Sequence, residues 1–521
     1  MNRQYQRITN ICKSNNGVNK IKYCFLLLVF TLFAQNTDNL VISENSGVTG
    51  SIGTVTINGE VYNQLSLRPV IPIGKLDIGL DLYLYFNDEG MYWESWDFSN
   101  GETSYRTIID KIYYLQWGQP EDNLYGIVGA LPSVTLGQGI LINNYSNLME
   151  YPQVRQVGLN LKAKVAGVRL ELIHSNFKTT TPGIIGVRGS YALLPKLSIG
   201  ASAVSDLDQM SGLPDSDGDN YPDYYDDYPD DESKYNEAWE IYLDNSDAWE
   251  EQFYCSGSEE CLQPHLIELL GDTFNDYDPE LVEKDPISGM ALDVAYTLNE
   301  KITLFSQVAF LRGEINNPNY LGDDSKLGWG LVPLGAKVKL GYVNLLTEYR
   351  MSSERFIFSY WDRAYDVNRV SVDTSGITTR ENQLYLYGIL NGFYAHADMG
   401  FMDLFNLGIG YQNMQGGKWD EESNEYRSGE TNQAFLASIG VNPSLIPKVG
   451  KAEAFYQQSN VPNPFEFEPN GSTIWGYNFG IEVSSGVMLV YKNRTTYISD
   501  LENEGQYKSI ELIQIETQFI F

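Results

Sequence analysis

The last thirteen residues, SIELIQIETQFIF at positions 509–521, alternate between apolar and polar side chains. Strict alternation is typical of a β-strand, because successive side chains of a strand point to opposite faces. One face holds Ile513, Ile515, Thr517, Phe519 and Phe521. The opposite face holds Gln514, Glu516 and Gln518. We therefore expect a strand with one face in an apolar medium and the other in a polar medium.

The same alternation recurs in LDIGLDLYLYF at positions 76–86, and again within residues 159–172 and 336–350. Eleven residues exceed the five or six that are usual in soluble proteins and match the 9 to 11 that a tilted strand needs to cross a bilayer. The polar faces carry both signs of charge and need water, whereas the apolar faces need hydrocarbon. The pattern indicates strands that cross a membrane.

Short and long connections alternate along the chain. We expect short turns near residues 72–75, 166–167, 194–196, 299–301, 340–341, 400–403, 447–448 and 484–486. We expect long polar loops at about 87–110, 132–152, 206–287, 313–326, 353–381, 414–432, 459–472 and 498–507. Short turns at one end and long loops at the other are typical of an outer-membrane β-barrel.

In this architecture, and in a terminal strand that stops on Phe521, the chain resembles Gram-negative outer-membrane proteins. The resemblance implies an outer-membrane location, contact with membrane lipid, and recognition of the final phenylalanine by the barrel-assembly machinery. The predicted fold class is all-β, a transmembrane antiparallel β-barrel of about 18 strands (range 16–20) over residues 35–521. The count depends on how the Asn58-Gly59 turn and residues 111–131 are divided.

Residues 1–34 have the composition of a secretory signal peptide. Five basic and no acidic residues accompany the apolar run at 23–33, and Ala34 precedes the expected cleavage point. A membrane anchor is the weaker interpretation, because the run is shorter than the about 20 residues that a spanning helix needs. Removal of this segment would leave 30 Lys and Arg against 68 Asp and Glu. This excess of acid argues against nucleic acid as a partner.

Residues 206–287 form a strongly acidic insertion with 26 Asp and Glu against two Lys. We interpret it as an extracellular excursion from the barrel wall. Tyr235, Ala238, Trp239 and Tyr242 follow helical spacing, so the insertion is expected to be partly helical. Cys255 and Cys261 lie within it and, in an exported protein, suggest a disulfide, although two free thiols are the alternative.

The stretch DSDGDNYPDYYD at positions 215–226 has the spacing of a twelve-residue calcium loop. Oxygen ligands would come from the carboxylates of Asp215, Asp217, Asp219, Asp223 and Asp226 and the carbonyl of Tyr221. The pattern resembles the calcium-binding aspartate repeats of the thrombospondin type 3 kind, which implies bound Ca²⁺. It departs from an EF-hand loop because Asn220 replaces the usual glycine and Asp226 replaces the final glutamate. A solvated acidic loop without fixed metal is the alternative.

The polar faces of the strands supply candidates for a channel lining. These pore-lining candidates are Asp77, Asp81, Lys162, Lys164, Arg169, Glu171, Lys337, Lys339, Glu348, Arg350 and Glu453. The segment at 137–152 is less polar than an ordinary outer loop, so it either folds into the lumen and narrows it or packs on the surface. Only three histidines are present and no hydrolase, zinc-protease or phosphate-loop motif occurs, so we do not expect an enzyme.

A barrel of 16 to 18 strands is wide enough for an aqueous channel. The leading functional prediction is therefore porin-like diffusion or uptake of small solutes, with a calcium-stabilised surface loop. The alternative is a surface interaction protein, in which the barrel anchors the acidic insertion for adhesion or for a secretion partner. Conductance separates the two, because a barrel filled by its own loops would show none.

Overall fold

The computed structural model describes residues 47–520 with gaps. The gaps are residues 58–59, 89, 92–95, 97, 150, 152–154, 179–182, 214, 216–220, 230–233, 235–283, 318, 323, 374–375, 402–403, 442–445, 447 and 501–505. The predicted signal peptide, most of the acidic insertion and Phe521 therefore lie outside the described residues.

Most of the described chain is β-strand. The strands of the wall are β1 (Gly47–Ile57), β2 (Glu60–Ile73), β3 (Leu76–Leu80), β4 (Leu82–Asn87), β6 (Ile112–Trp117), β7 (Leu124–Gly129), β8 (Gly158–Val165), β9 (Val168–His174), β10 (Ile184–Leu194), β11 (Leu197–Asp206), β12 (Ile287–Asn299), β13 (Ile302–Arg312), β14 (Trp329–Leu340), β15 (Val343–Ser352), β18 (Tyr387–Phe401), β19 (Phe405–Asp420), β20 (Glu425–Val441), β21 (Val449–Val461), β22 (Ile474–Ser484), β23 (Val487–Ser499) and β24 (Tyr507–Ile520). The remaining elements are the strands β5 (Gly90–Met91), β16 (Val370–Asp373) and β17 (Gly376–Thr379), the helices α3 (Gly101–Asp110) and α7 (Tyr365–Asn368), and the 3₁₀ turns η3 (Gln209–Gly212) and η5 (Leu384–Leu386).

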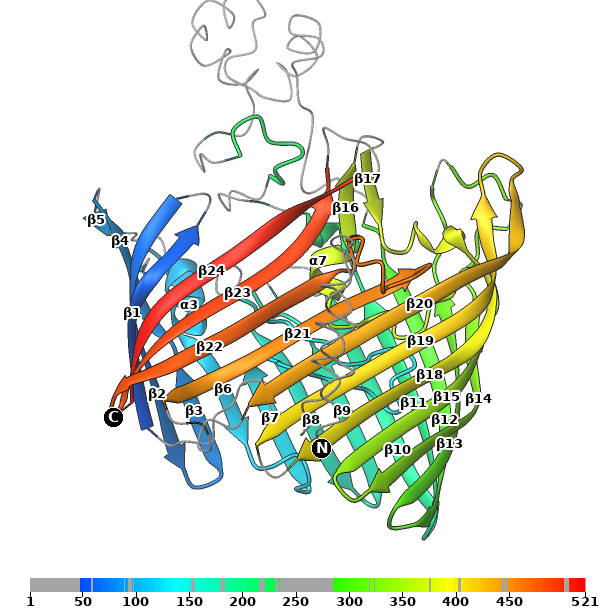
Figure 1. Ribbon diagram of the computed structural model, residues 1–521, viewed down its shortest axis with the longest axis horizontal. Helices are drawn as coiled ribbons and strands as arrows, with labels where there is room; N and C mark the ends of the chain where they lie inside the picture. The colour runs from blue at the N-terminus through cyan, green and yellow to red at the C-terminus, as the bar shows by residue number, and fades with distance from the viewer. Residues whose placement is uncertain are drawn as a thin grey trace, which may run out of the picture.

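The wall closes on itself, as Figure 1 shows. Each strand pairs antiparallel with its neighbours, and β24 pairs with β1 from Thr49 opposite Ile520 to Thr54 opposite Ile515. With β3 and β4 taken as one interrupted strand, the barrel has 20 wall strands. The predicted fold class is confirmed, and the count lies at the upper end of the predicted range. The strand count depended on two regions of the sequence, the turn at Asn58-Gly59 and residues 111–131. In the structure these regions form the β1–β2 hairpin and the strands β6 and β7.

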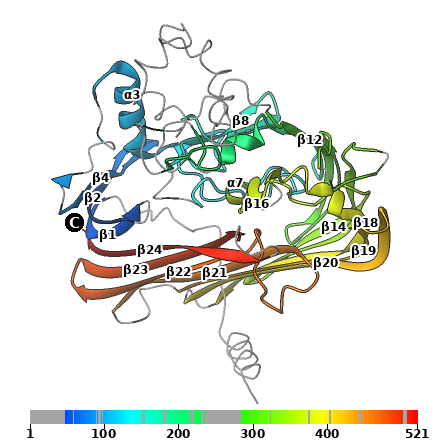
Figure 2. The same ribbon diagram turned by 90° about the horizontal axis from the view of Figure 1, so that it is seen from above.

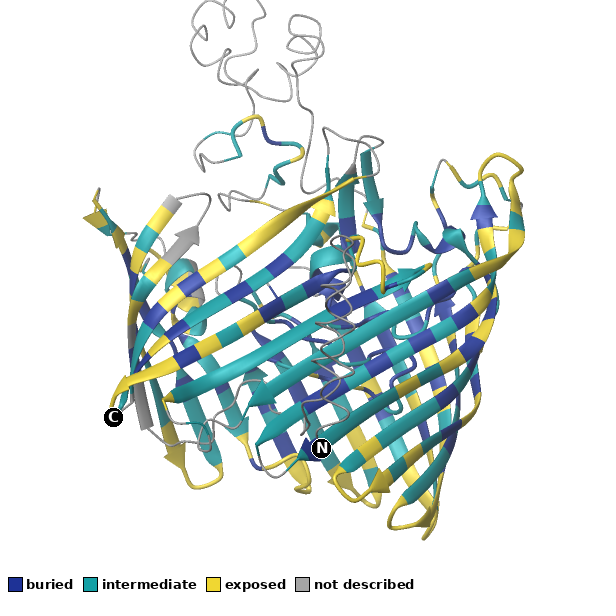
Figure 3. Ribbon diagram, viewed as in Figure 1, coloured by how far each residue is buried: buried dark blue, intermediate teal, exposed yellow. Residues whose placement is uncertain are grey.

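The two faces of the wall differ in polarity. On β24 the outward Ile513 and Ile515 are 40% and 43% exposed, whereas the inward Gln514 and Glu516 are 3% and 1% exposed. The same stripes of exposed and buried residues run along neighbouring strands in Figure 3. An apolar outer wall around a closed barrel is the arrangement that a bilayer requires, because no backbone edge is left unpaired in lipid. The protein is therefore an outer-membrane β-barrel.

Part of the wall ladder is interrupted beside Asp81. β3 pairs with β6 only as far as Leu80 opposite Ile112, and β4 then pairs with β2 and β5. The amide of Asp81 donates to the carbonyl of Lys111 at 2.9 Å. The side chain of Asp81 points into the lumen at this break, where it is fully buried.

The alternation of short turns and long loops is confirmed, with two exceptions at the long-loop end: β1 and β2 are separated by only two residues, and the loop predicted at 414–432 is mostly strand. Residues 414–432 were predicted to form a long loop, but β19 and β20 remain paired to Asp420 opposite Glu425. The glycines of this stretch allow close strand packing, since a Cβ on Gly416 would collide with the carbonyl oxygen of Ile389. Among the described helices, none is long and apolar enough to cross a bilayer.

Candidate functional site

Two long loops fold into the lumen and form an internal plug, which we define as residues 130–149 and 353–386. Viewed from above, α7 and β16 of the second loop lie inside the ring of strands (Figure 2). Ile142 and Tyr145 of the first loop and Tyr360, Trp361 and Tyr365 of the second are fully buried. Of the two interpretations of residues 137–152, the structure therefore supports the inward fold.

The two plug loops bind each other through backbone and side-chain contacts. The amide of Asn143 donates to the carbonyl of Trp361 at 3.1 Å, and the amide of Trp361 donates to the carbonyl of Leu141 at 3.1 Å. The hydroxyl of Tyr145 donates to Oδ2 of Asp366 at 2.7 Å. The two loops can therefore separate only if these hydrogen bonds break. Otherwise they move as one unit.

The plug contacts opposite sides of the wall. On β12, a Cβ at Gly289 would lie 3.0 Å from the ring of Trp361, so the missing side chain makes room for the indole. On β23, Nη1 of Arg494 donates to the carbonyls of Leu148 at 2.9 Å and Tyr151 at 3.3 Å. On β21, Nε2 of Gln457 donates to Asp362 at 3.3 Å. The plug therefore spans the lumen between β12 and β21–β23.

Arg363 lies beside these contacts on the β21 side of the plug. Its guanidinium carbon lies 5.0 Å from the ring centre of Phe455. Among the residues that the structure describes, no carboxylate pairs with Arg363. Burial, followed by the neighbouring charge of Arg494, lowers the pKa of Arg363 to about 10. Arg363 therefore stays protonated at neutral pH, with no carboxylate among the described residues to offset its charge.

A polar junction ties the second plug loop to the start of the acidic insertion. Tyr365 donates to Oδ2 of Asp206 at 2.8 Å, and Nη1 of Arg369 lies 3.5 Å from the same oxygen. Nε2 of Gln209 donates to Oε2 of Glu381 at 3.2 Å. Burial, helped by the charge of Asp285, raises the pKa of Glu381 to about 9, so this carboxyl is neutral at pH 7.

Asp366 belongs to the same plug loop and is also strongly perturbed. Burial raises the pKa of its carboxyl to about 6, although the nearby Arg369 and the Tyr145 hydroxyl oppose the shift. The Asp366 carboxyl therefore loses its proton as the pH rises through about 6.

Asp81, a predicted pore-lining residue, lies in a luminal charge cluster. Its carboxylate accepts from Nε of Arg68 at 3.0 Å and from Nη1 of Arg155 at 2.7 Å. Nη1 of Arg68 also lies 3.5 Å from Glu516, which pairs with Lys492 at 2.5 Å. The cluster joins β2 to the closing strands β23 and β24 and to the chain that follows the first plug loop.

Glu348 and Arg350, two further predicted pore-lining residues, form a second cluster on β15. Nη2 of Arg350 lies 2.6 Å from Oε2 of Glu348, and Nη1 donates to Gln412 at 2.5 Å. Gln307 donates to the other carboxylate oxygen of Glu348 at 3.0 Å. All of these side chains are buried, so the lumen at this point is packed with paired polar groups.

The other predicted pore-lining residues are spread over the wall. Lys162 and Glu171 are 4.0 Å apart, and Glu453 lies 3.4 Å from Lys451. Five more lie toward the short-turn end and are exposed or half-buried: Asp77, Lys164, Arg169, Lys337 and Lys339. The structure does not bring Asp77, Lys164, Arg169 or Lys339 into either buried cluster, whereas Lys337 interacts electrostatically with Glu348 of the second cluster.

Sequence reasoning missed several luminal charges. Arg188 on β10 binds Asp293 on β12 at 2.5 Å and 3.0 Å. Arg68, Arg155, Lys492 and Glu516 were not proposed as lining residues. Alternation alone could have found Glu516, since it lies on the polar face of the terminal strand. The pairing of Arg188 with Asp293 depends on the order of the strands around the barrel, which alternation does not give.

The predicted calcium loop is only partly described. Asp215, Tyr221, Asp223 and Asp226 are within the described residues, whereas Asp217 and Asp219 are outside them. Asp226 is buried, and its Oδ1 accepts from the amide of Tyr228 at 2.7 Å. Within the described part of the chain, no group of three or more His, Cys, Asp or Glu residues could hold a metal ion. Cys255 and Cys261 are outside it, so the calcium site and the disulfide stay predictions.

No protein-family model and no curated protein matches the chain. Its fold is similar to that of OprD from Pseudomonas aeruginosa, with 10% identity, a TM-score of 0.31, and coverage of 94% of this chain and 98% of that one. It is also similar to the siderophore receptor PirA from Acinetobacter baumannii, with 8% identity, a TM-score of 0.33 and coverage of 92% and 81%. A third structure is Wzi from Escherichia coli, an outer-membrane carbohydrate-binding β-barrel involved in capsule assembly, with 10% identity, a TM-score of 0.29 and coverage of 91% and 84%. The outer-membrane assignment of this chain depends on its own closed barrel and apolar outer wall.

Proposed function

We propose that this protein is an outer-membrane channel for the passive diffusion or uptake of small polar solutes, with a lumen narrowed by the internal plug. The observation that carries the proposal is a closed barrel whose inner wall holds clusters of charged and amide side chains, such as those around Asp81 and Glu348, beside the apolar residues that pack against the plug. Water and polar solutes are stable next to these charged and amide groups. No covalent chemistry is assigned to the lumen.

The plug supports a selective passage rather than a wide pore. The two loops are joined by hydrogen bonds and contact the wall on both sides, so a solute must pass beside them or displace them. Charges of both signs occur on the wall in close pairs, such as Arg350 with Glu348. Paired charges give weak binding sites, which suits passage because a solute must leave as well as enter.

Single-channel conductance in planar bilayers tests the proposal. We expect small, discrete conductance steps from the purified protein and larger steps when residues 137–145 are replaced by a short Gly-Ser linker. A matched control is the same linker in the hairpin at 421–424, at the same end of the barrel, which should leave conductance unchanged. Absence of conductance in both the native and the linker-replaced protein would contradict the channel and favour the surface-interaction alternative.

We propose further that Ca²⁺ stabilises the outward loop at residues 215–226. The donor set of five carboxylates and one carbonyl is what a hard cation prefers, and burial of the Asp226 carboxylate is compatible with an ordered loop. Calcium would supply structural cross-linking of the loop. Limited proteolysis of the insertion should be slower in Ca²⁺ than in chelator. The double variant Asp217→Asn, Asp223→Asn should digest at the chelator rate under both conditions.

Two partner proposals accompany the channel. We propose that the barrel-assembly machinery recognises β24 and Phe521, which predicts less protein in the outer membrane after deletion of Phe521 than after deletion of a loop residue. A cell-surface partner for the acidic insertion would be lost on removal of residues 206–287. Under the channel proposal, the same deletion leaves conductance in place.

A further inference from the structure

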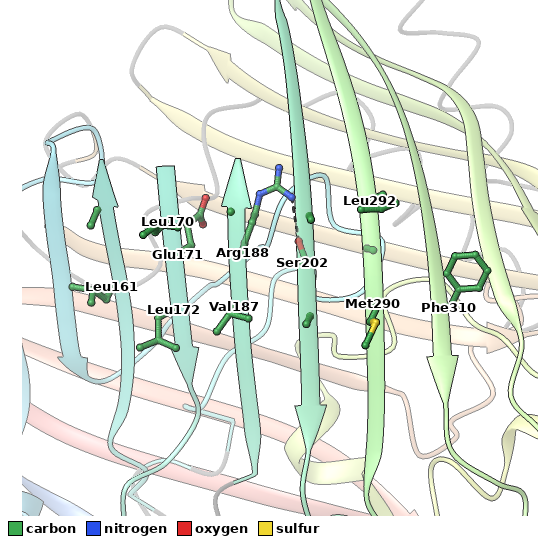
Figure 4. Close-up of a pocket in the computed structure, with 15 residues that line it drawn as sticks. Leu161, Leu170, Glu171, Leu172, Val187, Arg188, Ser202, Met290, Leu292 and Phe310 are labelled. Carbon is green, nitrogen blue, oxygen red and sulfur yellow. Dashed lines mark hydrogen bonds between the residues drawn. The ribbon is translucent and has the colours of Figure 1, made fainter. Parts of the chain in front are cut away.

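An apolar groove lies on the outer face of the wall between β8 and β13 (Figure 4). Its volume is about 830 Å³. The side chains that form it include Leu161, Leu172, Val187, Met290, Leu292 and Phe310. These residues belong to the outward faces of their strands, so the groove opens to the hydrocarbon of the bilayer and not to the lumen.

The strand register explains why the wall is hollow here. One row across the wall runs Leu172, Val187, Ala203, Met290 and Phe310, and the next row toward the short-turn end runs Leu170, Gly189, Ala201 and Leu292. Gly189, Ala201 and Ala203 are the small residues in the middle of both rows. Larger side chains on β9 and on β12 and β13 form the two sides of the groove. A groove therefore follows from three small residues placed together on adjacent strands.

The next row toward the long-loop end is more polar. In this row Ile185 is paired with Ser205, Ser205 with Ser288, and Ser288 with Arg312. The two serine hydroxyls are 2.9 Å apart. Arg312 is exposed, and it forms no ion pair with any residue in the described part of the chain. Arg312 is two residues beyond Phe310 on the same face, a rise of about 6.6 Å along the strand.

The position of this polar row matches the outer boundary of the membrane. Trp329 is paired with Phe310 and points outward, and tryptophan is enriched at the level of lipid headgroups. The long loops lie at the same end of the barrel, and in outer-membrane barrels these loops face the outside. The groove thus lies in the outer leaflet, directly below the exposed guanidinium of Arg312 at headgroup level.

We propose that this outer face binds lipid A, the acylated and phosphorylated anchor of lipopolysaccharide, which is the lipid of the outer leaflet. One acyl chain lies in the groove over Gly189, Ala201 and Ala203, and a phosphate group lies at Arg312. A guanidinium matches phosphate in charge and in hydrogen-bond geometry. A second barrel is a poorer occupant, because its wall is convex and would not fill a narrow groove, whereas a flexible chain adopts the shape of the groove.

The binding energy has two sources in this setting. An acyl chain that enters the groove comes from the hydrocarbon of the bilayer and not from water. The gain in binding free energy therefore comes from close packing rather than from the hydrophobic effect. The phosphate at Arg312 adds the attraction of one basic residue at a membrane surface. Lipid binding therefore depends on both the groove and Arg312. A separate substitution tests each of them.

Native mass spectrometry of the detergent-purified protein, with defined lipid added, measures this binding. We expect lipid A to remain bound at lower concentration than phosphatidylglycerol. Arg312→Gln should weaken lipid A binding roughly fivefold, the factor that corresponds to about 1 kcal/mol for one basic residue. Removal of the phosphates from lipid A should weaken binding to the native protein by a similar factor and should have little effect on Arg312→Gln.

The groove is tested by Ala201→Leu, which fills its floor with a side chain that suits lipid. Ala395→Leu on β18 is the matched control, because Ala395 is an exposed small residue far around the wall. We expect Ala201→Leu to weaken lipid A binding and Ala395→Leu to leave it unchanged, with both variants folded by heat-modifiable gel mobility. Equal binding of lipid A by all variants would overturn the proposal, as would a dimer that Ala201→Leu abolishes in the absence of lipid.

Discussion

Substitution of Trp361 by alanine is expected to loosen the internal plug and raise channel conductance. The indole is fully buried between the first plug loop and the space left by Gly289 on β12. The substitution leaves the two backbone hydrogen bonds of Trp361 with Leu141 and Asn143 in place. The expected effect is therefore the loss of side-chain packing alone.

The magnitude follows from the burial. Replacement of a buried tryptophan or phenylalanine by alanine costs about 3 to 5 kcal/mol, since the vacated space is only partly refilled. If the plug opens as one unit, this cost raises the open population by roughly 10²-fold or more. A plug that is closed almost all the time in the native protein would then open often enough to be seen in single-channel records.

Two measurements check this expectation. Single-channel recordings of Trp361→Ala should show openings to a larger conductance level, and hydrogen exchange should be faster at the amides of Asn143 and Trp361, which donate the hydrogen bonds between the two loops. Trp117→Ala is the control, because Trp117 is 45% exposed on the outer wall and does not touch the plug. Native conductance together with native exchange rates in Trp361→Ala would refute the idea that these loops form the constriction.

Three further outcomes are expected. The raised pKa of Asp366, about 6 against an ordinary 3.8, means that its stabilising contribution is complete below about pH 4 and is lost as pH rises through 6. Plug protection in hydrogen exchange should therefore fall between pH 4 and 7 by up to about 3 kcal/mol, and Asp366→Asn should remove this dependence. Arg350→Met should cost about 3 to 5 kcal/mol in denaturant unfolding because it leaves Glu348 buried and unpaired, and adding Glu348→Leu should recover most of the loss. Ile515→Arg should cost about 2 to 4 kcal/mol on the lipid face, whereas Asn478→Arg, which faces Glu453 in the lumen, should cost much less.

Much of the wall could be predicted from the sequence, because a membrane barrel imposes a period of two on every strand. Ile515 and Glu516 lie on opposite faces as that period requires. The prediction of a long polar loop at residues 414–432 was wrong because polarity alone does not distinguish a loop from the polar face of a strand. Only the register of β18, β19 and β20 shows that these residues are paired.

The plug could be predicted only in part. The apolar residues of the first loop, such as Ile142, indicated burial but not the partner. Trp361 and Tyr365 lie more than 200 residues further along the chain, and nothing local in the sequence pairs them with Ile142 or Tyr145. The same limit applies to Arg188 and Asp293, because their contact is set by strand order around the barrel. Local periodicity thus specifies the wall, and long-range packing specifies what fills it.

The arrangement of charge inside the barrel bears on what can pass. Arg68 with Asp81, Arg188 with Asp293 and Arg350 with Glu348 are close pairs, and a close pair presents little net field to a passing ion. Arg363 differs, because it is protonated at neutral pH and pairs with no carboxylate within the described part of the chain. This positive charge in a plug that spans the lumen favours anions over cations, even though the whole chain is strongly acidic. Reversal potentials in a salt gradient should therefore show anion preference that Arg363→Gln reduces and that Arg427→Gln, at an exposed hairpin, leaves unchanged.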